Sequence, residues 1–151
     1  MKRKDFDIKK IKKSSKGDCF ICKHKFDDEE IVFEDEKFIT FLDLYPPTKG
    51  YSILAPKKHF TDITDMSESE YLEFQRVLFR LSDAIKKALR PKRICLLNSG
   101  ALLAHWHFHI IPMYNEIYDN FIDVILKKSV LKFSKTEKKE MVMNIRKYLK
   151  L

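Results

Sequence analysis

Three histidines alternate with large apolar residues over residues 105–111, which read HWHFHII. Side chains two residues apart lie on the same face of a β-strand, so this pattern predicts a strand with all three imidazoles on one side. The residues between them would then face the core. Packing alone gives no reason to align three imidazoles. The row therefore indicates either a metal site or nucleophilic and acid–base chemistry.

The rest of the chain predicts further strands and one long helix. Short apolar runs bounded by acidic or Pro/Gly-containing turns predict strands at 31–33, 38–42, 51–55 and 94–97. The segment Ser67-Glu68-Ser69-Glu70 is a capping box, after which apolar residues from Tyr71 to Ala88 recur at spacings of three and four. This stripe predicts a helix of about 20 residues that ends before Pro91.

The fold class that these elements predict is α+β, an antiparallel sheet with a long helix packed on it and an added helical C-terminal segment. Residues 121–126 and 137–149 supply the added helices, the second behind another capping box at 134–137. A chain of 151 residues suits one domain. We expect that domain at 17–115, with a basic extension at 1–16 and a basic helical extension at 116–151.

The net charge of +8 is concentrated at the two ends of the chain. Residues 1–16 carry +6 and residues 127–151 carry +7, whereas the middle carries −5. Nucleic-acid binding through these ends is possible but not favoured, because no aromatic residues are interleaved with the charges. Only three glycines occur, far apart, which excludes a dinucleotide-binding loop and a P-loop.

No secretory signal and no apolar run of membrane-spanning length occur, so we expect a cytoplasmic protein without a membrane segment. In that compartment the pair Cys19-Phe20-Ile21-Cys22 indicates metal binding or redox activity rather than a disulfide. Zn²⁺ prefers four sulfur and nitrogen ligands, and His59 and His105 could complete a Cys₂His₂ site. Cys95 lies in an apolar run and is expected in the core.

The run H-x-H-x-H followed by two apolar residues resembles the signature of the histidine-triad (HIT) family of nucleotide hydrolases and transferases. The likeness extends over roughly residues 18–113. It includes the DCFICK start at 18–23, the hairpin at 33–46, the segment GYSILAPKKH at 50–59 and the NSG turn at 98–100. The resemblance implies a HIT-like sheet and a homodimer, since family members commonly pair.

The resemblance also implies a role for individual residues. His107, the middle histidine, corresponds to the nucleophile, His109 to a residue that binds the phosphate oxygens, and Asp43 to the carboxylate that accepts the ribose hydroxyls. The other implied nucleotide-binding residues are Phe20, Ile21, Phe41 and Leu44 around the base, and Asn98 and Gly100 beside the phosphate. In the zinc-bearing branch, the ligands of a structural Zn²⁺ correspond to Cys19, Cys22, His59 and His105.

The function implied is hydrolysis at the α-phosphate of a dinucleoside polyphosphate or nucleoside phosphoramidate, with an adenine-containing substrate expected. It would proceed through a covalent nucleotidyl-histidine and release a nucleoside monophosphate. Because the third histidine is retained, hydrolysis or phosphorolysis is favoured over sugar-nucleotide transfer. The chain departs from many members between Asn98 and His105, where 101–104 read ALLA and supply no hydroxyl or amide. The alternatives are a phosphorylase or nucleotidyltransferase, and a zinc-stabilised nucleotide-binding module with little turnover.

Overall fold

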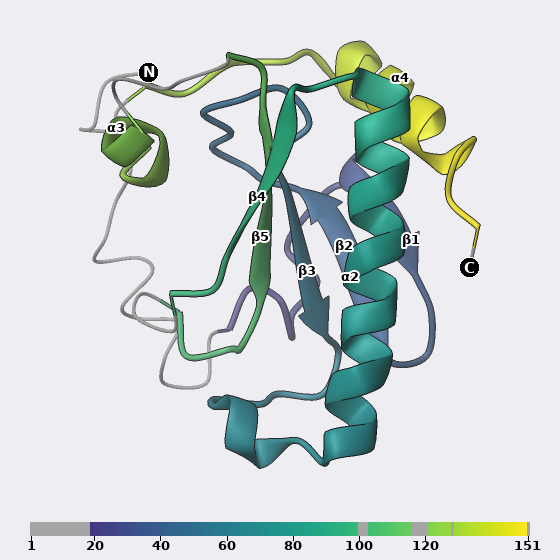
Figure 1. Cartoon of the computed structure of the whole chain (residues 1–151), viewed down its shortest axis with the longest axis vertical. Helices are drawn as coiled ribbons and strands as arrows, with labels where there is room; N and C mark the ends of the chain where they lie inside the picture. Colours follow the sequence, from purple (N-terminus) through teal and green to yellow (C-terminus); the bar gives the residue numbers. More distant parts are fainter. Residues whose placement is uncertain (1–18, 100–102, 116–120, 128, 151) are drawn as a thin grey trace.

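The computed structural model describes residues 19–99, 103–115, 121–127 and 129–150. Its centre is a five-stranded antiparallel sheet with the strand order β1-β2-β3-β5-β4 (Figure 1). The strands are β1 (Ile31–Glu34), β2 (Phe38–Leu42), β3 (Ser52–Pro56), β4 (Arg93–Leu97) and β5 (Phe108–Met113). The central strands β2 and β3 are buried along their whole length.

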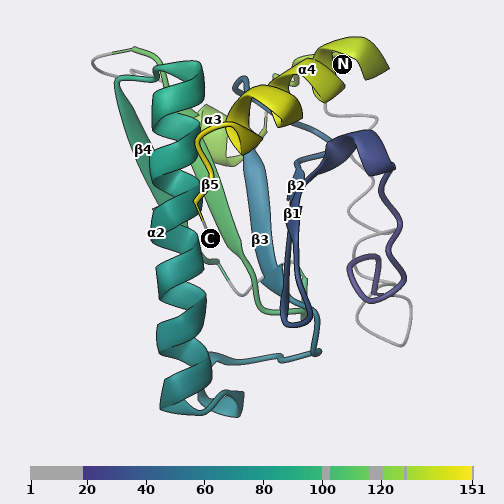
Figure 2. The same ribbon diagram turned by 90° about the vertical axis from the view of Figure 1, so that its right-hand side faces the viewer.

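The helices are α2 (Glu68–Leu89), α3 (Phe121–Ile125) and α4 (Lys135–Arg146), with short 3-10 helices η2 (Asp28–Glu30) and η3 (Ile63–Asp65). Helix α2 covers one face of the sheet, and residues 19–30, which precede β1, lie on the other side (Figure 2). The predicted α+β class, with its antiparallel sheet, long helix and C-terminal helix, is confirmed. Among the described residues, no helix is long and apolar enough to cross a membrane.

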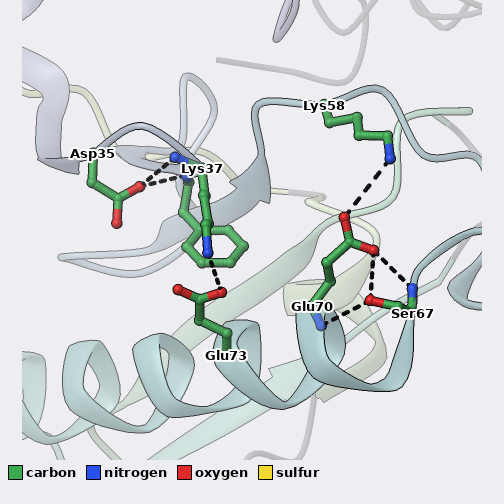
Figure 3. Close-up of polar contacts among 7 residues, drawn as sticks. Asp35, Lys37, Lys58, Ser67, Glu70 and Glu73 are labelled. Atoms are coloured by element: carbon green, nitrogen blue, oxygen red, sulfur yellow. Dashed lines mark hydrogen bonds and ion pairs between the residues drawn. The ribbon is translucent and has the colours of Figure 1, made fainter.

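Helix α2 begins at the predicted capping box. The Glu70 carboxylate accepts hydrogen bonds from the backbone N–H and hydroxyl of Ser67, and the Ser67 hydroxyl accepts from the Glu70 N–H at 3.2 Å (Figure 3). Lys37, in the β1–β2 turn, donates to Glu73 at 2.7 Å and so links the hairpin to the helix. The helix ends at Arg90, whose left-handed backbone (φ 53°) turns the chain toward β4.

The main hydrophobic core lies between α2 and the sheet. Its helical half consists of the buried residues Phe74, Val77, Leu78, Leu81, Ala84 and Ile85. The sheet contributes side chains that alternate along β2, β3 and β5, such as Leu54 and Ile110, together with Trp106. Each fully buried side chain of this size contributes about 1.5–3 kcal/mol of transfer free energy. The neighbouring side chains on these strands, including His109, therefore face away from α2.

Helix α4 packs into the same core as α2. Met141, Val142 and Ile145 are buried against it. Arg146 donates to the backbone carbonyls of Ile31 (2.8 Å) and Val32 (3.0 Å), so it satisfies acceptors on the edge strand β1. The predicted second capping box is present, with Ser134 as the N-cap. The predicted division of the chain at 115–116 stays a prediction, and the extension at 1–16 lies outside the described residues.

The strand that carries the histidines begins later than predicted. Strand β5 starts at Phe108, so His109 lies in it but His105 and His107 precede it. The β3–β5 ladder pairs Leu54 with Phe108 and goes no further. Pro56 ends β3 and has no N–H to continue the ladder. The segment 105–107 makes other bonds, and the backbone N–H of Trp106 donates to the Phe60 carbonyl at 2.7 Å.

Candidate active site and metal centre

His107 lies just before β5, on the face of the sheet opposite α2, and is 7% exposed. Its Nδ1 lies 2.6 Å from the backbone carbonyl oxygen of His105. A carbonyl can only accept, so Nδ1 carries the proton and donates it. The Nε2 atom then has a free lone pair. Burial lowers the pKa of His107 and so favours this neutral ring.

His109 contacts His107 directly, with the two Nε2 atoms 3.0 Å apart. Because Nε2 of His107 is an acceptor, Nε2 of His109 is the donor in this pair. Burial, followed by the neighbouring His107, lowers the pKa of His109 to about 3. Its Nδ1 is buried and has no hydrogen-bond partner among the residues that the structure describes. Two neutral imidazoles therefore lie side by side, one with a lone pair and one with an N–H.

Asn98 follows β4 and reaches the same segment. Its side-chain amide donates to the backbone carbonyl of His107 at 2.7 Å. The structure thus places Asn98 where it holds the backbone of His107, and its predicted phosphate-side role stays a prediction. Gly100, the other predicted phosphate-side residue, lies outside the described residues.

Asp43 directly follows β2 and is nearly inaccessible, with a side chain 3% exposed. Its carboxylate accepts from the backbone N–H of Tyr45 at 2.7 Å. Both of its oxygens also contact the Nζ of Lys127, at 2.7 and 2.6 Å. Burial lowers the pKa of both His107 and His109; the Asp43 carboxylate partly opposes this shift, and the neighbouring Lys127 adds to it.

Of the four residues predicted to surround the base, three lie in one cluster and Leu44 does not. Phe20, Ile21 and Phe41 belong to one apolar cluster, and the Phe20 ring meets Phe41 edge-on with centroids 6.0 Å apart. Phe26 stacks on Phe41 at 4.3 Å and is a further aromatic residue there. Leu44 is not in that cluster and is 40% exposed.

Cys19, Cys22, His59 and His105 come together into a possible metal site. Their ligand atoms all lie within 4.8 Å of one another. The Nδ1 of His105 lies 3.4 Å from the sulfur of Cys19 and 3.3 Å from that of Cys22, and the Nδ1 of His59 lies 3.1 Å from the latter. Tetrahedral zinc with Zn–S and Zn–N bonds of usual length separates S and N ligands by about 3.5 Å. The donor set and spacing therefore fit Zn²⁺.

His105 is the fully buried member of this set, with 0% exposure. Its Nε2 lies 2.7 Å from the Pro56 carbonyl oxygen, so Nε2 donates and Nδ1 presents a lone pair to the two sulfurs. Burial lowers the pKa of His105 to about 4, which keeps the ring neutral. A ring nitrogen hydrogen-bonded in this way is typical of histidines that bind metals.

Sequence reasoning missed two residues of the site. Lys127 lies 84 residues from Asp43 along the chain and is one of many lysines near the C-terminus. Tyr51 is buried beside His109, with ring centroids 5.7 Å apart. Lys127 belongs to no recognisable motif, and Tyr51 lies in the family-like segment 50–59 but was given no role there. Cys95, expected in the core, is only partly buried and packs near Tyr51.

Comparison with known proteins identifies the family. The model of the HIT domain family matches residues 25–116, more than half of the chain. The chain belongs to the HIT family. An uncharacterized HIT-like protein from Saccharolobus solfataricus is 29% identical over 103 residues, which cover 65% of this chain and 74% of that relative.

Two further proteins are similar to this chain, one in sequence and one in structure. An adenosine 5'-monophosphoramidase of Schizosaccharomyces pombe is 30% identical over 107 residues, which cover 66% of this chain and 77% of that enzyme. The crystal structure of a hypothetical histidine triad nucleotide-binding protein from Sulfolobus tokodaii superposes with a TM-score of 0.70 and 28% identity. That alignment covers 87% of this chain and 91% of the other.

Proposed function

We propose that this HIT protein is a nucleotidyl hydrolase. The Nε2 of His107 attacks the α-phosphorus of a dinucleoside polyphosphate or nucleoside phosphoramidate. A P–N bond to His107 forms while the bond from phosphorus to the leaving group breaks, and the leaving group departs with its electron pair and takes up a proton. Water then cleaves the nucleotidyl-imidazole, which releases a nucleoside monophosphate and restores the neutral ring.

The observation that carries this proposal is the hydrogen bond from His107 Nδ1 to the His105 carbonyl. It holds the ring in the tautomer with a lone pair on Nε2, and a nucleophile needs that lone pair. Burial removes the competing protonation by lowering the pKa of His107. The nucleophile is therefore oriented and neutral before substrate binds.

His109 supplies the complementary hydrogen bond. Its Nε2–H, which now points at His107 Nε2 at 3.0 Å, can turn to a phosphate oxygen when His107 attacks. Asp43 is acceptor-only when ionised and would take the ribose hydroxyls as donors. Phe20 is the partly exposed member of the predicted base-binding residues and would contact the base, with Ile21 and Phe41 buried in the cluster that supports it.

Cys19, Cys22, His59 and His105 would hold a structural zinc ion, since their sulfur and nitrogen atoms fit a tetrahedral site. When bound, zinc would fix these four side chains relative to one another without an open coordination position.

Similarity favours a phosphoramidate substrate. The S. pombe relative that is 30% identical bears the name adenosine 5'-monophosphoramidase, which supports an adenine nucleotide and a P–N leaving group.

Two alternatives use the same residues. A phosphorylase or nucleotidyltransferase would pass the nucleotidyl group from His107 to phosphate or another acceptor, and a zinc-stabilised module would bind nucleotide with little turnover.

A phosphoramidate assay distinguishes these functions. We expect purified protein to convert adenosine 5'-phosphoramidate to AMP, whether or not inorganic phosphate is present. ADP formed only with phosphate would indicate phosphorolysis. Tight AMP binding without product would indicate the binding module.

Substitution of the histidines tests the mechanism. His107→Ala should abolish turnover but retain AMP binding, and rapid acid quenching of the wild type should give a labelled, acid-labile nucleotidyl-protein. His109→Ala should slow turnover by roughly 10²–10³-fold, as loss of one oxyanion donor does. Arg76→Ala, on the exposed face of α2, is the matched control and should match the wild type. Wild-type turnover in His107→Ala would overturn the nucleophile assignment.

The homodimer and the cytoplasmic location stay predictions. Leu72 (50% exposed), Phe79 (73%) and Leu96 (45%) are apolar side chains on the outer surface of α2 and on the edge strand β4. Such residues are common in the contacts between subunits. Sedimentation velocity at micromolar concentration would show a dimer if they meet a second copy, and Phe79→Glu should then give monomers.

A further inference from the structure

Lys127 joins the site from a segment outside the matched HIT domain, residues 25–116. It lies two residues after the end of α3 at Ile125, and its ammonium contacts both oxygens of Asp43 at 2.7 and 2.6 Å. The Lys127 side chain is 12% exposed and that of Asp43 is 3% exposed. Surface ion pairs contribute little, but this pair is almost closed to solvent, so each charge depends on the other.

The local fold holds Lys127 in this position. Val124 of α3 packs against the buried cluster of Tyr51, Ile111 and Met113. The backbone N–H of Lys127 donates to the Val124 carbonyl at 3.1 Å, and its φ of 49° is left-handed. A left-handed residue commonly ends a helix, and here it turns the chain after α3. The docked helix α3 thus fixes the position from which the Lys127 side chain reaches Asp43.

The Lys127 ammonium is linked to His109 through the ring of Tyr51. It is 5.1 Å from the centroid of the Tyr51 ring, and that ring meets His109 edge-on at 5.7 Å. Burial lowers the pKa of His109 to about 3, so this imidazole is neutral at physiological pH. Lys127 therefore brings a full positive charge to a place where the histidine itself has none.

We propose that Lys127 is a phosphate-binding residue of this HIT protein, which holds Asp43 in the free protein and binds phosphate oxygens of the bound nucleotide. The inference rests on the proposed function. An ammonium has three N–H donors, and an ionised carboxylate only accepts. Ribose hydroxyls can replace Lys127 donors at Asp43, which leaves the ammonium donors to face the phosphate.

Charge explains why Lys127 should remain in the site rather than leave it. A phosphate bound near the buried Asp43 carboxylate would meet a like charge in a poorly solvated place. An ammonium beside both anions changes that repulsion into attraction. Residues 101–104 read ALLA and carry no side-chain hydroxyl or amide, so a cation from another segment would add a donor.

Binding of AMP and of adenosine separates this role from the alternatives. Both ligands offer base and ribose, but only AMP offers phosphate. We expect Lys127→Met to weaken AMP binding by roughly 10- to 100-fold, the range for a lost charge-assisted hydrogen bond. Adenosine binding should change by less than about threefold. Lys127→Arg should retain most of the AMP affinity, and Lys132→Met, an exposed lysine nearby, is the matched control.

Three outcomes would overturn the proposal. Unchanged AMP binding in Lys127→Met would show that the lysine does not contact phosphate. Tighter binding of both ligands would show that Lys127 blocks the ribose position. Equal weakening of both would show that it only supports Asp43.

Two controls keep these results interpretable. Lys127→Met leaves Asp43 unpaired and could destabilise the protein, so the comparison is repeated between Asp43→Asn and the double variant Asp43→Asn/Lys127→Met. The selective loss of AMP binding should persist in that background.

The proposed function fails separately, if wild-type protein neither binds AMP nor cleaves the phosphoramidate. If the wild-type protein cleaves the phosphoramidate but Lys127→Met binds AMP as tightly as the wild type does, only the role of Lys127 is overturned.

Discussion

The truncation Ile145→Ala tests whether α4 is part of the core that holds the site. Ile145 has 0% exposure and packs with Leu81 and Ile85 in the cluster beneath the sheet. The substitution removes three buried carbon groups, at about 0.8 kcal/mol each, and leaves a cavity that α4 fills only partly. Alanine's better helix propensity returns a few tenths of a kcal/mol.

We therefore expect Ile145→Ala to lower the free energy of unfolding by about 3 kcal/mol. In a domain of this size that loss corresponds to roughly 6–12 °C in Tm. Urea denaturation followed by circular dichroism measures it, provided that the m-value stays constant. Met143→Ala lies on the same helix at a 53% exposed position and should change stability by less than about 0.5 kcal/mol.

A loss below about 1 kcal/mol in Ile145→Ala, or one equal to that of Met143→Ala, would refute the reasoning. Helix α4 would then be peripheral. A large loss would mean that the segment after residue 116 folds together with the HIT domain.

Three further predictions concern the site. Cys19→Ser should lower the zinc content from close to one ion per chain, and Tm should fall with it. Cys95→Ser is the control and should retain the metal. An unchanged zinc content in Cys19→Ser would exclude the assigned ligands. Because burial lowers the pKa of His109 to about 3 from an unfolded value near 6.5, its contribution to stability is complete above pH 6.5 and is lost as the pH falls toward 3. Denaturation at several pH values should show a smaller slope in His109→Gln than in wild type, and equal slopes would contradict the shift. Asn98→Ala removes the donor to the His107 carbonyl and should lower kcat by about tenfold with little effect on AMP affinity. Steady-state kinetics measures this, and a change in KM alone would argue against a positioning role.

Much of the fold was predictable because its signals are local. The apolar stripe after Ser67 predicted the helix to within two residues of its observed end at Leu89. Strand β2 was predicted with its observed bounds, Phe38–Leu42. Both signals depend on side-chain spacing within one segment, where the periods of helix and strand differ clearly.

The start of β5 was not predictable from alternation, because the pairing partner decides where a ladder ends. The period of two continues through His105 and His107, but Pro56 interrupts the opposite strand. The zinc ligand set was proposed from the C-x-x-C pair and two histidines and was also implied by the family resemblance, and the structure brings those four side chains together. The contact between Lys127 and Asp43 joins residues 84 apart and depends on how α3 docks, which no local pattern encodes.

The geometry around His105 joins the metal centre to the nucleophile through a single residue. Its ring donates to the Pro56 carbonyl and presents Nδ1 to the cysteine sulfurs, while its own backbone carbonyl accepts the proton of His107 Nδ1. A shift of His105 would therefore remove the acceptor that selects the reactive tautomer of His107. A metal held by four protein ligands has no open position for substrate. It would influence the reaction through this carbonyl, so loss of zinc should reduce kcat more than nucleotide affinity.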